Sequence, residues 1–223
     1  KNPRPEIWMK KGVYAMSANE GWAMFTIVPG TKIYGGFAGD ENPATFNKND
    51  RDMFENKTVL DAKDYYRAID HYSSTYDYEK SIIDGFTFKN GNAEPIYLER
   101  IPISITSFPD EYMGGAIRLK DNVTVANCEL YNNVAVKGGA IYADNNSSKM
   151  NVVISYSKFH DNYAHTEGGA IVMSRKYDGI ATQCDSIVNC EISNNKSDRF
   201  AGLNINWTKV LNSTIVGNNT EMY

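Results

Sequence analysis

Short alternations of apolar and polar residues follow one another along most of the chain, and one pattern of eleven residues recurs. Its five copies align without a gap. In each copy the first position is β-branched and the sixth is large and apolar. Such alternation, together with β-branched residues, is typical of strands, and long helix-forming stretches are nearly absent. The pattern predicts an all-β protein, with copies that begin at Ile83, Val125, Ile154, Ile187 and Val210.

The spacing of the copies predicts a solenoid. From the second copy onward, successive copies begin 29, 33 and 23 residues apart, so a fixed unit alternates with connections of variable length. One unit alone cannot bury its apolar face, whereas stacked units bury a continuous core. Equal positions in neighbouring coils of such a stack lie about 4.8 Å apart. We therefore expect the β-branched and the large apolar positions to form the interior.

The ninth position of the unit is asparagine in four copies. Stacked asparagine side chains can hydrogen-bond to one another and to the backbone of the bends between strands. We therefore expect a structural asparagine ladder in the solenoid, formed by Asn133, Asn162, Asn195 and Asn218.

Two other features are expected to shape the backbone. The third position of the unit is glycine or asparagine in four copies and Tyr156 in the remaining one. Glycine and asparagine tolerate left-handed backbone angles, so a bend is expected there. The sequence Gly-Gly-Ala-Ile recurs at 114–117, 138–141 and 168–171, with a degenerate copy at Phe200–Ile205. We expect its glycines to let stacked coils approach closely where the chain enters a strand, and each coil is predicted to hold three strands.

Composition excludes several classes of function. The net charge of -4 and the pI of about 5.4 offer no broad basic surface for nucleic acid. No apolar run in the sequence reaches the roughly 20 residues that span a bilayer. Three cysteines and three histidines match no zinc-binding spacing and no disulfide framework. We therefore predict no metal, no cofactor and no transmembrane segment.

The chain is long enough for one domain with a sizeable core. Residues 1–80 are expected to form an N-terminal cap and the first, irregular coils, with Trp8 and Trp22 packed over the first coil. Residues 81–223 are expected to form the regular coils, with an insertion at 94–113. Because the sequence does not begin with methionine, we expect the chain to be part of a longer protein.

These motifs resemble the right-handed, single-stranded parallel β-helix of the pectin-lyase-like superfamily. The Gly-Gly-Ala-Ile sequence, together with units such as Val125–Ala135, is most similar to the repeats of polymorphic outer-membrane proteins. Segments such as Lys32–Asp40 and Ser81–Ala93 resemble the opening coils of secreted β-helix surface proteins of Bacteroidetes type. The resemblance implies this fold and a secreted or cell-surface location, outside the cell or at a bacterial outer membrane. It leaves the function open, because the fold carries enzymes, adhesins and binding proteins.

Three functions are weighed for such a protein. A glycoside hydrolase needs paired carboxylates, and the polygalacturonase-like branch of the superfamily has aspartates where this chain has its glycine pairs. A polysaccharide lyase that acts on a uronate-containing polymer needs a base and a cation or metal beside the acid group. Basic and tyrosine side chains near the Gly-Gly-Ala-Ile strands could converge, but Asp121 and Asp144 are isolated and form no acidic cluster for calcium. A non-catalytic module needs only a long face with exposed aromatic and amide side chains.

The non-catalytic surface module, which would bind a polysaccharide or another surface protein, is the favoured interpretation, and the lyase is the alternative. No residue is assigned a catalytic role, and the oligomeric state stays open. The side chains expected to line a carbohydrate-binding face are Arg118, Lys120, Tyr142, Asp144, Arg175, Lys176, Tyr177, Asn204 and Asn206.

Overall fold

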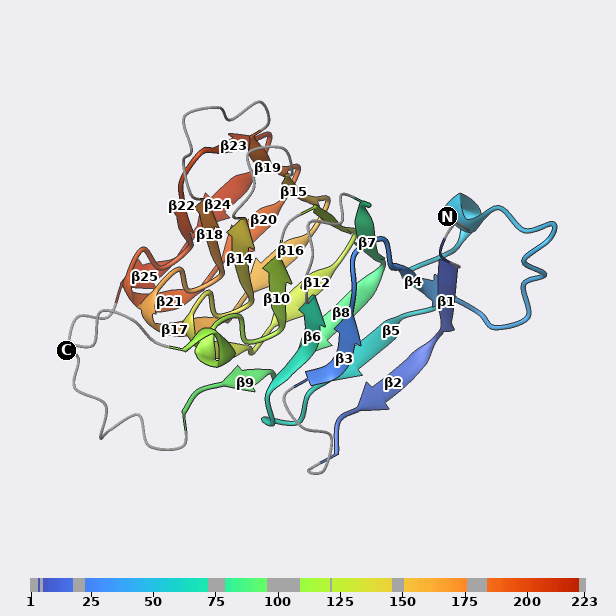
Figure 1. Ribbon diagram of the computed structural model, residues 1–223, viewed down its shortest axis with the longest axis horizontal. Helices are drawn as coiled ribbons and strands as arrows, with labels where there is room; N and C mark the ends of the chain where they lie inside the picture. The colour runs from blue at the N-terminus through green and yellow to red at the C-terminus, as the bar shows by residue number, and fades with distance from the viewer. Residues whose placement is uncertain are drawn as a thin grey trace.

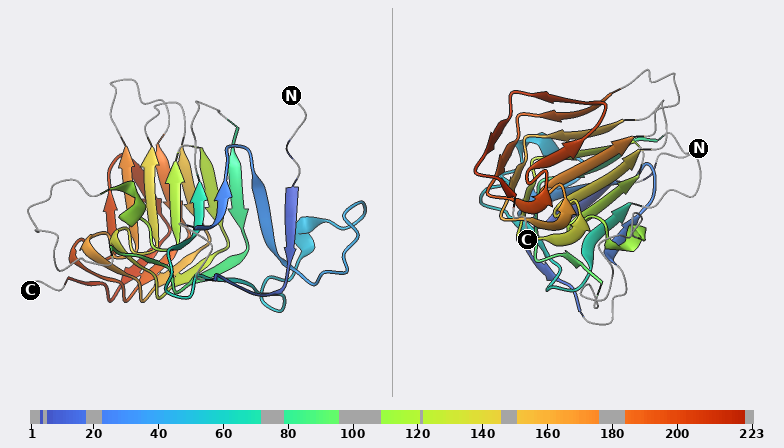
Figure 2. Two further views of the ribbon diagram at one scale, coloured as in Figure 1. Left: turned by 60° about the horizontal axis from the view of Figure 1, so that its bottom comes forward. Right: turned by 90° about the vertical axis from the view of Figure 1, so that its left-hand side faces the viewer.

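The chain winds into a coil of short strands that stack side by side along one axis (Figures 1 and 2). The strands pair into four sheets, and all of the pairing is parallel. The predicted parallel β-helix is therefore confirmed. The computed structural model describes residues 4, 6–17, 23–71, 79–95, 109–120, 122–145, 151–175 and 184–220.

Two of the sheets contain seven strands each, and we call them sheets A and B. Sheet A consists of β1 (Glu6–Lys10), β4 (Lys32–Phe37), β7 (Ser81–Asp84), β11 (Val123–Ala126), β15 (Val152–Ser155), β19 (Asp185–Val188) and β23 (Thr208–Leu211). Sheet B consists of β2 (Gly12–Ala15), β5 (Thr58–Asp61), β8 (Phe86–Lys89), β12 (Glu129–Tyr131), β16 (Lys158–His160), β20 (Glu191–Ser193) and β24 (Thr214–Val216).

The other two sheets, C and D, have six and five strands. Sheet C consists of β3 (Ala23–Ile27), β6 (Arg67–His71), β10 (Ile117–Lys120), β14 (Ile141–Asn145), β18 (Ile171–Arg175) and β22 (Leu203–Ile205). Sheet D consists of β9 (Asn92–Ala93), β13 (Val134–Lys137), β17 (Tyr163–Glu167), β21 (Lys196–Arg199) and β25 (Asn219–Thr220). Among the residues that the structure describes, two short 3-10 helices, η1 (Lys48–Asp50) and η3 (Asp110–Tyr112), lie in loops between coils or strands.

The repeat coils contain four strands, which corrects the prediction of three. Within the described residues, the first two coils have three strands each, β1 to β3 and β4 to β6, and sheet D begins only with β9. The additional strand lies between the asparagine ladder and the glycine pair, where the sequence shows no steady apolar alternation. A left-handed residue just before each ladder position turns the chain out of sheet B and into sheet D. These residues are Asn90, Asn132, Asp161, Asn194 and Gly217.

The bend predicted at the third position of the unit is present in all five copies. Gly85 has a φ of 83° and Asn127, Asn189 and Asn212 have φ values between 49° and 54°. Tyr156 adopts the same left-handed conformation, with a φ of 51°, although a residue with a bulky side chain is strained there. The coil geometry therefore overrides the preference of this one residue.

The two glycines of each pair serve different purposes. The first has a φ between 64° and 72°, in the left-handed region that glycine adopts without cost. At the second, a Cβ atom would lie 2.1 to 2.3 Å from a carbonyl oxygen of the next coil, which no side chain can tolerate. The expected steric role of the glycine pairs is thereby confirmed, with the second position held by Gly115, Gly139 and Gly169.

Asparagine side chains connect four successive coils at the corner between sheets B and D. The Nδ2 group of Asn133 donates to Oδ1 of Asn162, Asn162 donates to Asn195, and Asn195 donates to Asn218, each over 2.9 Å. Oδ1 of Asn133 in turn accepts from the backbone N–H of Gly91 at 2.9 Å. Because each amide also donates to a backbone carbonyl, these buried polar groups are satisfied.

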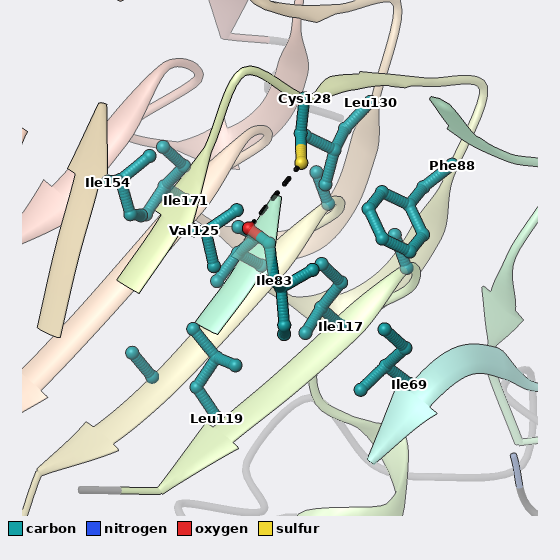
Figure 3. Packing of buried hydrophobic residues seen from close by; sticks show 14 of the residues in the cluster. Ile69, Ile83, Phe88, Ile117, Leu119, Val125, Cys128, Leu130, Ile154 and Ile171 are labelled. Atoms are coloured by element: carbon teal, nitrogen blue, oxygen red, sulfur yellow. Dashed lines mark hydrogen bonds between the residues drawn. The ribbon is translucent and has the colours of Figure 1, made fainter. Parts of the chain in front are cut away.

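The core is a set of apolar columns that run along the coil axis (Figure 3). The β-branched positions of sheet A and the large apolar positions of sheet B are fully buried in the four coils from Ile83 to Ile192. Cys128 lies beside them, where its Sγ donates to a backbone carbonyl at 3.0 Å and burial raises the pKa of the thiol to about 12. In the last described coil the same apolar column opens to solvent, and Ile215 is 48% exposed.

A long loop between β4 and β5 projects beside the first coil, drawn in light blue in Figures 1 and 2. The Trp8 ring stacks on Phe37 with centroids 4.5 Å apart, and Phe46 from the loop meets both rings edge-on. Aromatic contacts of this kind bury large apolar areas, so Trp8 packs under the loop at this end of the coil. Trp22 lies outside the described residues.

His71 is a buried titratable residue inside the coil. It pairs in register with Ile27 of the preceding coil, and its Nε2 lies 3.0 Å from the Ser81 hydroxyl. Burial lowers the pKa of this imidazole to about 4, because the charged form loses its hydration. The histidine is therefore neutral in the folded protein at neutral pH.

Replacing Asn162 by alanine should cut the ladder in its middle. The variant loses the two hydrogen bonds that Asn162 donates, and it leaves the buried backbone N–H of Asn133 without its acceptor, so we expect unfolding to become easier by about 3 kcal/mol. Urea denaturation followed by circular dichroism measures the change. The exposed loop residue Asn49 provides the matched control, since Asn49→Ala should leave the midpoint nearly unchanged; equal midpoints for the two variants would contradict the role of the ladder.

The buried His71 should make the fold sensitive to acid. The unfolded chain takes up a proton near pH 6.5 and the folded chain only near pH 4, so stability present above pH 6.5 is lost as the pH falls toward 4. At pH 4.5 this loss amounts to about 2 to 3 kcal/mol. We expect His71→Leu to remove that part of the pH dependence in urea titrations at pH 7 and pH 4.5, and identical pH profiles for the two proteins would refute the assignment.

Candidate ligand-binding surface on sheet C

Parallel register aligns side chains of sheet C into a stripe that runs along the coil axis. Inward positions are the isoleucines of the core, and the residues that follow them face outward because side chains alternate along a strand. The outward line contains an acid, a base, a phenol, an aliphatic residue and an amide. We call this line the sheet C stripe: Asp70, Arg118, Tyr142, Val172 and Asn204.

Arg118 is held by Asp70 across neighbouring coils. Its Nε and Nη2 atoms donate to the two carboxylate oxygens at 2.8 and 2.6 Å, and each side chain is only 13% exposed. Burial by itself would lower the pKa of Arg118, but the hydrogen bonds and charge of Asp70 raise it above its usual value. A bidentate pair of this kind fixes the guanidinium geometrically, so Arg118 is committed to a structural contact within the stripe.

Lys120 also has an acidic partner. Its Nζ lies 3.2 Å from Oδ2 of Asp110, which belongs to η3, and its backbone pairs in register with Asp144. The positive groups that sequence analysis placed on this face are thus accompanied by carboxylates. The surface offers alternating charges and amides rather than a cationic patch.

A small cleft of about 110 Å³ opens beside Tyr142. One side carries the ion pair between Lys137 and Glu167, with Nζ and Oε1 2.5 Å apart. Burial, followed by the negative charges of nearby carboxylates, raises the pKa of Tyr142 to about 12. The phenol is therefore protonated at neutral pH, where it can donate a hydrogen bond but cannot serve as a general base. The other lining residues are Val172, Met173, Ser174, Asn204 and Asn206.

The structure separates one expected residue from the rest. The Arg175 side chain is fully buried, with Nη2 3.7 Å from Oδ1 of the buried Asp185. Its backbone N–H donates to the Asn206 side chain at 2.8 Å. Arg175 therefore lies in the interior, where its guanidinium is close to the buried carboxylate of Asp185. This burial corrects the expectation that Arg175 lines an exposed ligand-binding face. Lys176 and Tyr177 lie outside the described residues.

Sequence reasoning overlooked several members of this surface. Lys137 and Glu167 each stand directly before a glycine pair, so alignment of the repeat on that motif could have revealed a shared position. Asp70 and Asp110 carry no such signal. The coil of Asp70 lacks the glycine motif, and 48 residues separate it from Arg118, so only the folded register brings the two together.

The described residues contain no group of three or more histidine, cysteine, aspartate or glutamate side chains that could hold a metal ion. None of the helices in the described part of the chain has the length and apolar character needed to cross a membrane.

Comparison with known families identifies one match. Residues 127–144 match the model of the Chlamydia polymorphic membrane protein repeat. This stretch runs from the bend after β11, through the ladder residue Asn133 and the glycine motif, into β14, so it corresponds to most of one coil. The match indicates a repeat of the kind found in surface or outer-membrane proteins, in general agreement with the expected location. No curated protein and no solved structure matches the chain.

Proposed function

We propose that this chain is a non-catalytic β-helix module, secreted or displayed at a cell surface, that binds an extended glycan along the sheet C stripe. The observation that carries the proposal is the polar cleft at Tyr142, which interrupts an otherwise charge-paired surface. The family match at residues 127–144 supports a surface location. The glycan ligand and the absence of catalysis are inferences from the chemistry of the cleft.

The groups in the cleft suit hydroxyl-rich ligands. Tyr142 supplies a phenol that donates and a ring that a sugar face can contact, while Asn204, Asn206 and Ser174 supply amides and a hydroxyl. Because the neighbouring charges are already paired, the cleft favours neutral hydrogen-bonding groups over a free ion. Its volume of about 110 Å³ is well below the ~300 Å³ at which pockets enclose small molecules, so it fits one unit of a longer chain that lies along the stripe.

A polysaccharide lyase is the alternative, and the geometry disfavours it. Such an enzyme needs a base that accepts the proton next to a uronate carboxylate and a cation that neutralises the acid group. Tyr142 is protonated at neutral pH, and its pKa, raised to about 12, lies further from neutrality than that of an ordinary tyrosine; Arg118 and Lys120 already contact Asp70 and Asp110. These side chains are suited to holding a bound polysaccharide by hydrogen bonds, and they are poorly suited to removing a proton from it.

Binding to a panel of neutral and uronate-containing oligosaccharides tests the proposal by isothermal titration calorimetry. We expect a neutral member of the panel to bind, and Tyr142→Ala to weaken its Kd about fivefold or more, since loss of one aromatic contact and one hydrogen bond costs about 1 kcal/mol or more. Tyr131→Ala is the matched control. Tyr131 stacks on His160 over sheet B, so its removal should leave Kd unchanged.

Absorbance of the same mixtures distinguishes binding from catalysis. A lyase forms an unsaturated product, and the proposal expects none from any uronate-containing substrate. Product formation that disappears in Arg118→Ala or Lys120→Ala would establish the lyase instead. If no oligosaccharide binds, the glycan assignment fails and a protein ligand becomes the better explanation for the exposed face.

A further inference from the structure

A second hollow lies on sheet B and shares no lining residue with the cleft at Tyr142. Its volume is about 330 Å³. Its floor crosses β5, β8, β12 and β16, which are consecutive neighbours in the sheet. Four strands spaced about 4.8 Å apart span roughly 14 Å, so this sheet B groove runs along the coil axis and suits an elongated ligand.

One wall of the sheet B groove presents an aromatic ring on a firmly held loop. The backbone N–H groups of Phe54 and Glu55 both donate to Oδ1 of Asp52 at 3.0 Å. Nη2 of Arg51 donates to Asp84 of sheet A at 2.5 Å, and the guanidinium of Arg51 also lies over the rings of Tyr34 and Phe37 in β4. The loop is thus tied to the coil, yet the Phe54 side chain is left 79% exposed. Because so little of its apolar area is buried, the Phe54 ring contributes little to the stability of the described part of the protein.

The other wall carries Tyr156, the single bulky residue among the five bends of its column. Its φ of 51° is left-handed, and the ring is 64% exposed. A large side chain in this conformation strains the backbone, and an exposed ring gains little burial that would offset the strain. Strained residues of this kind concentrate at ligand-binding positions, where a rigid scaffold holds them in place.

The charged groups of the sheet B groove favour a negative ligand. Among the described residues, its lining includes Lys57 and Lys158 and one carboxylate, Glu129, within a chain whose net charge is -4. The Nζ of Lys57 lies 5.8 Å from the centroid of the Phe54 ring. Lys158 contacts Glu191 at 3.6 Å, but both side chains are about half exposed or more, and a solvated pair of this kind is easily exchanged for another partner.

We propose that the sheet B groove binds an acidic oligosaccharide, with sugar faces on Phe54 and Tyr156 and carboxylates near Lys57 and Lys158. Two ammonium groups suit a ligand with sparse negative charge. A nucleic acid, with a phosphate on every residue, would meet Glu129 and the net negative charge of the chain. The groove stands apart from the sheet C stripe, and its ligand differs from the neutral glycan expected there.

Titration of tetragalacturonate into the Tyr142→Ala protein tests this site with the sheet C cleft already weakened. We expect the Tyr142→Ala protein to bind this probe, and Phe54→Ala or Tyr156→Asn in that background to weaken Kd about fivefold or more. Lys57→Gln combined with Lys158→Gln should abolish the fall in affinity with added salt. Cellotetraose, a neutral chain of the same length, should bind at least tenfold more weakly.

Phe200 provides a matched control for Tyr156. It is also an exposed aromatic residue in the left-handed conformation, with a φ of 56°, and it lies outside the sheet B groove. Both Tyr156→Asn and Phe200→Asn should keep or raise the thermal midpoint, because asparagine accepts the left-handed angle more readily. Only Tyr156→Asn should weaken binding of tetragalacturonate.

Several results would overturn the proposal. These are a failure of the Tyr142→Ala protein to bind tetragalacturonate, equal binding of cellotetraose, or full affinity in Phe54→Ala. Tighter binding of a thymidine tetranucleotide than of the sugar would assign the groove to nucleic acid instead. A lower thermal midpoint for Tyr156→Asn would show that this tyrosine supports the fold. Loss of the sheet C proposal would leave these outcomes unchanged, because the sheet B variants are compared with one another in a single Tyr142→Ala background and with a different ligand.

Discussion

In-register hydrogen bonding between successive coils is the constraint on which the rest of this structure depends. Each strand pairs in parallel with the strands of its neighbouring coils, so residues at equal positions lie on top of one another about 4.8 Å apart. A slip of one residue would turn every apolar side chain of a strand outward. The asparagine ladder opposes such a slip, because Asn162 can donate to Asn195 only when both coils are in the same register.

The same constraint determines which residues the coil tolerates. The second glycine of each pair is required because the carbonyl of the next coil occupies the space of a side chain. In the last described coil, Ala201 stands at the corresponding position, and it supplies the carbonyl that approaches Gly169. The glycine requirement at Gly115, Gly139 and Gly169 thus comes from the carbonyl of the coil that follows each of them. The requirement is steric, and the glycine pair carries no chemistry of its own.

Stacking also converts single side chains into surfaces. Asp70, Arg118 and Tyr142 come from three coils, but their register makes them adjacent. Most charges on the sheet C stripe find an opposite charge one coil away, which leaves the hydrogen-bonding groups around Tyr142 as its available chemistry. Beside sheet B, by contrast, the aromatic rings of Phe54 and Tyr156 remain exposed, at 79% and 64%. The two surfaces therefore differ in the chemical groups that they present.

The sequence by itself determined the class of the fold, its buried columns, the bend at Gly85 and its equivalents, and the steric role of the glycine pairs. Each of these repeats at one position of the unit, and a repeated local requirement is visible without coordinates.

Tertiary structure decided the rest. The strands of sheet D were not predicted, because segments such as Lys196–Arg199 have no apolar alternation. They become strands only by pairing with a neighbouring coil. The burial of Arg175 beside Asp185, and the pairing of Arg118 with Asp70, depend on residues brought together across loops of unequal length. No local pattern encodes such contacts, because their energy arises only when the coils are stacked.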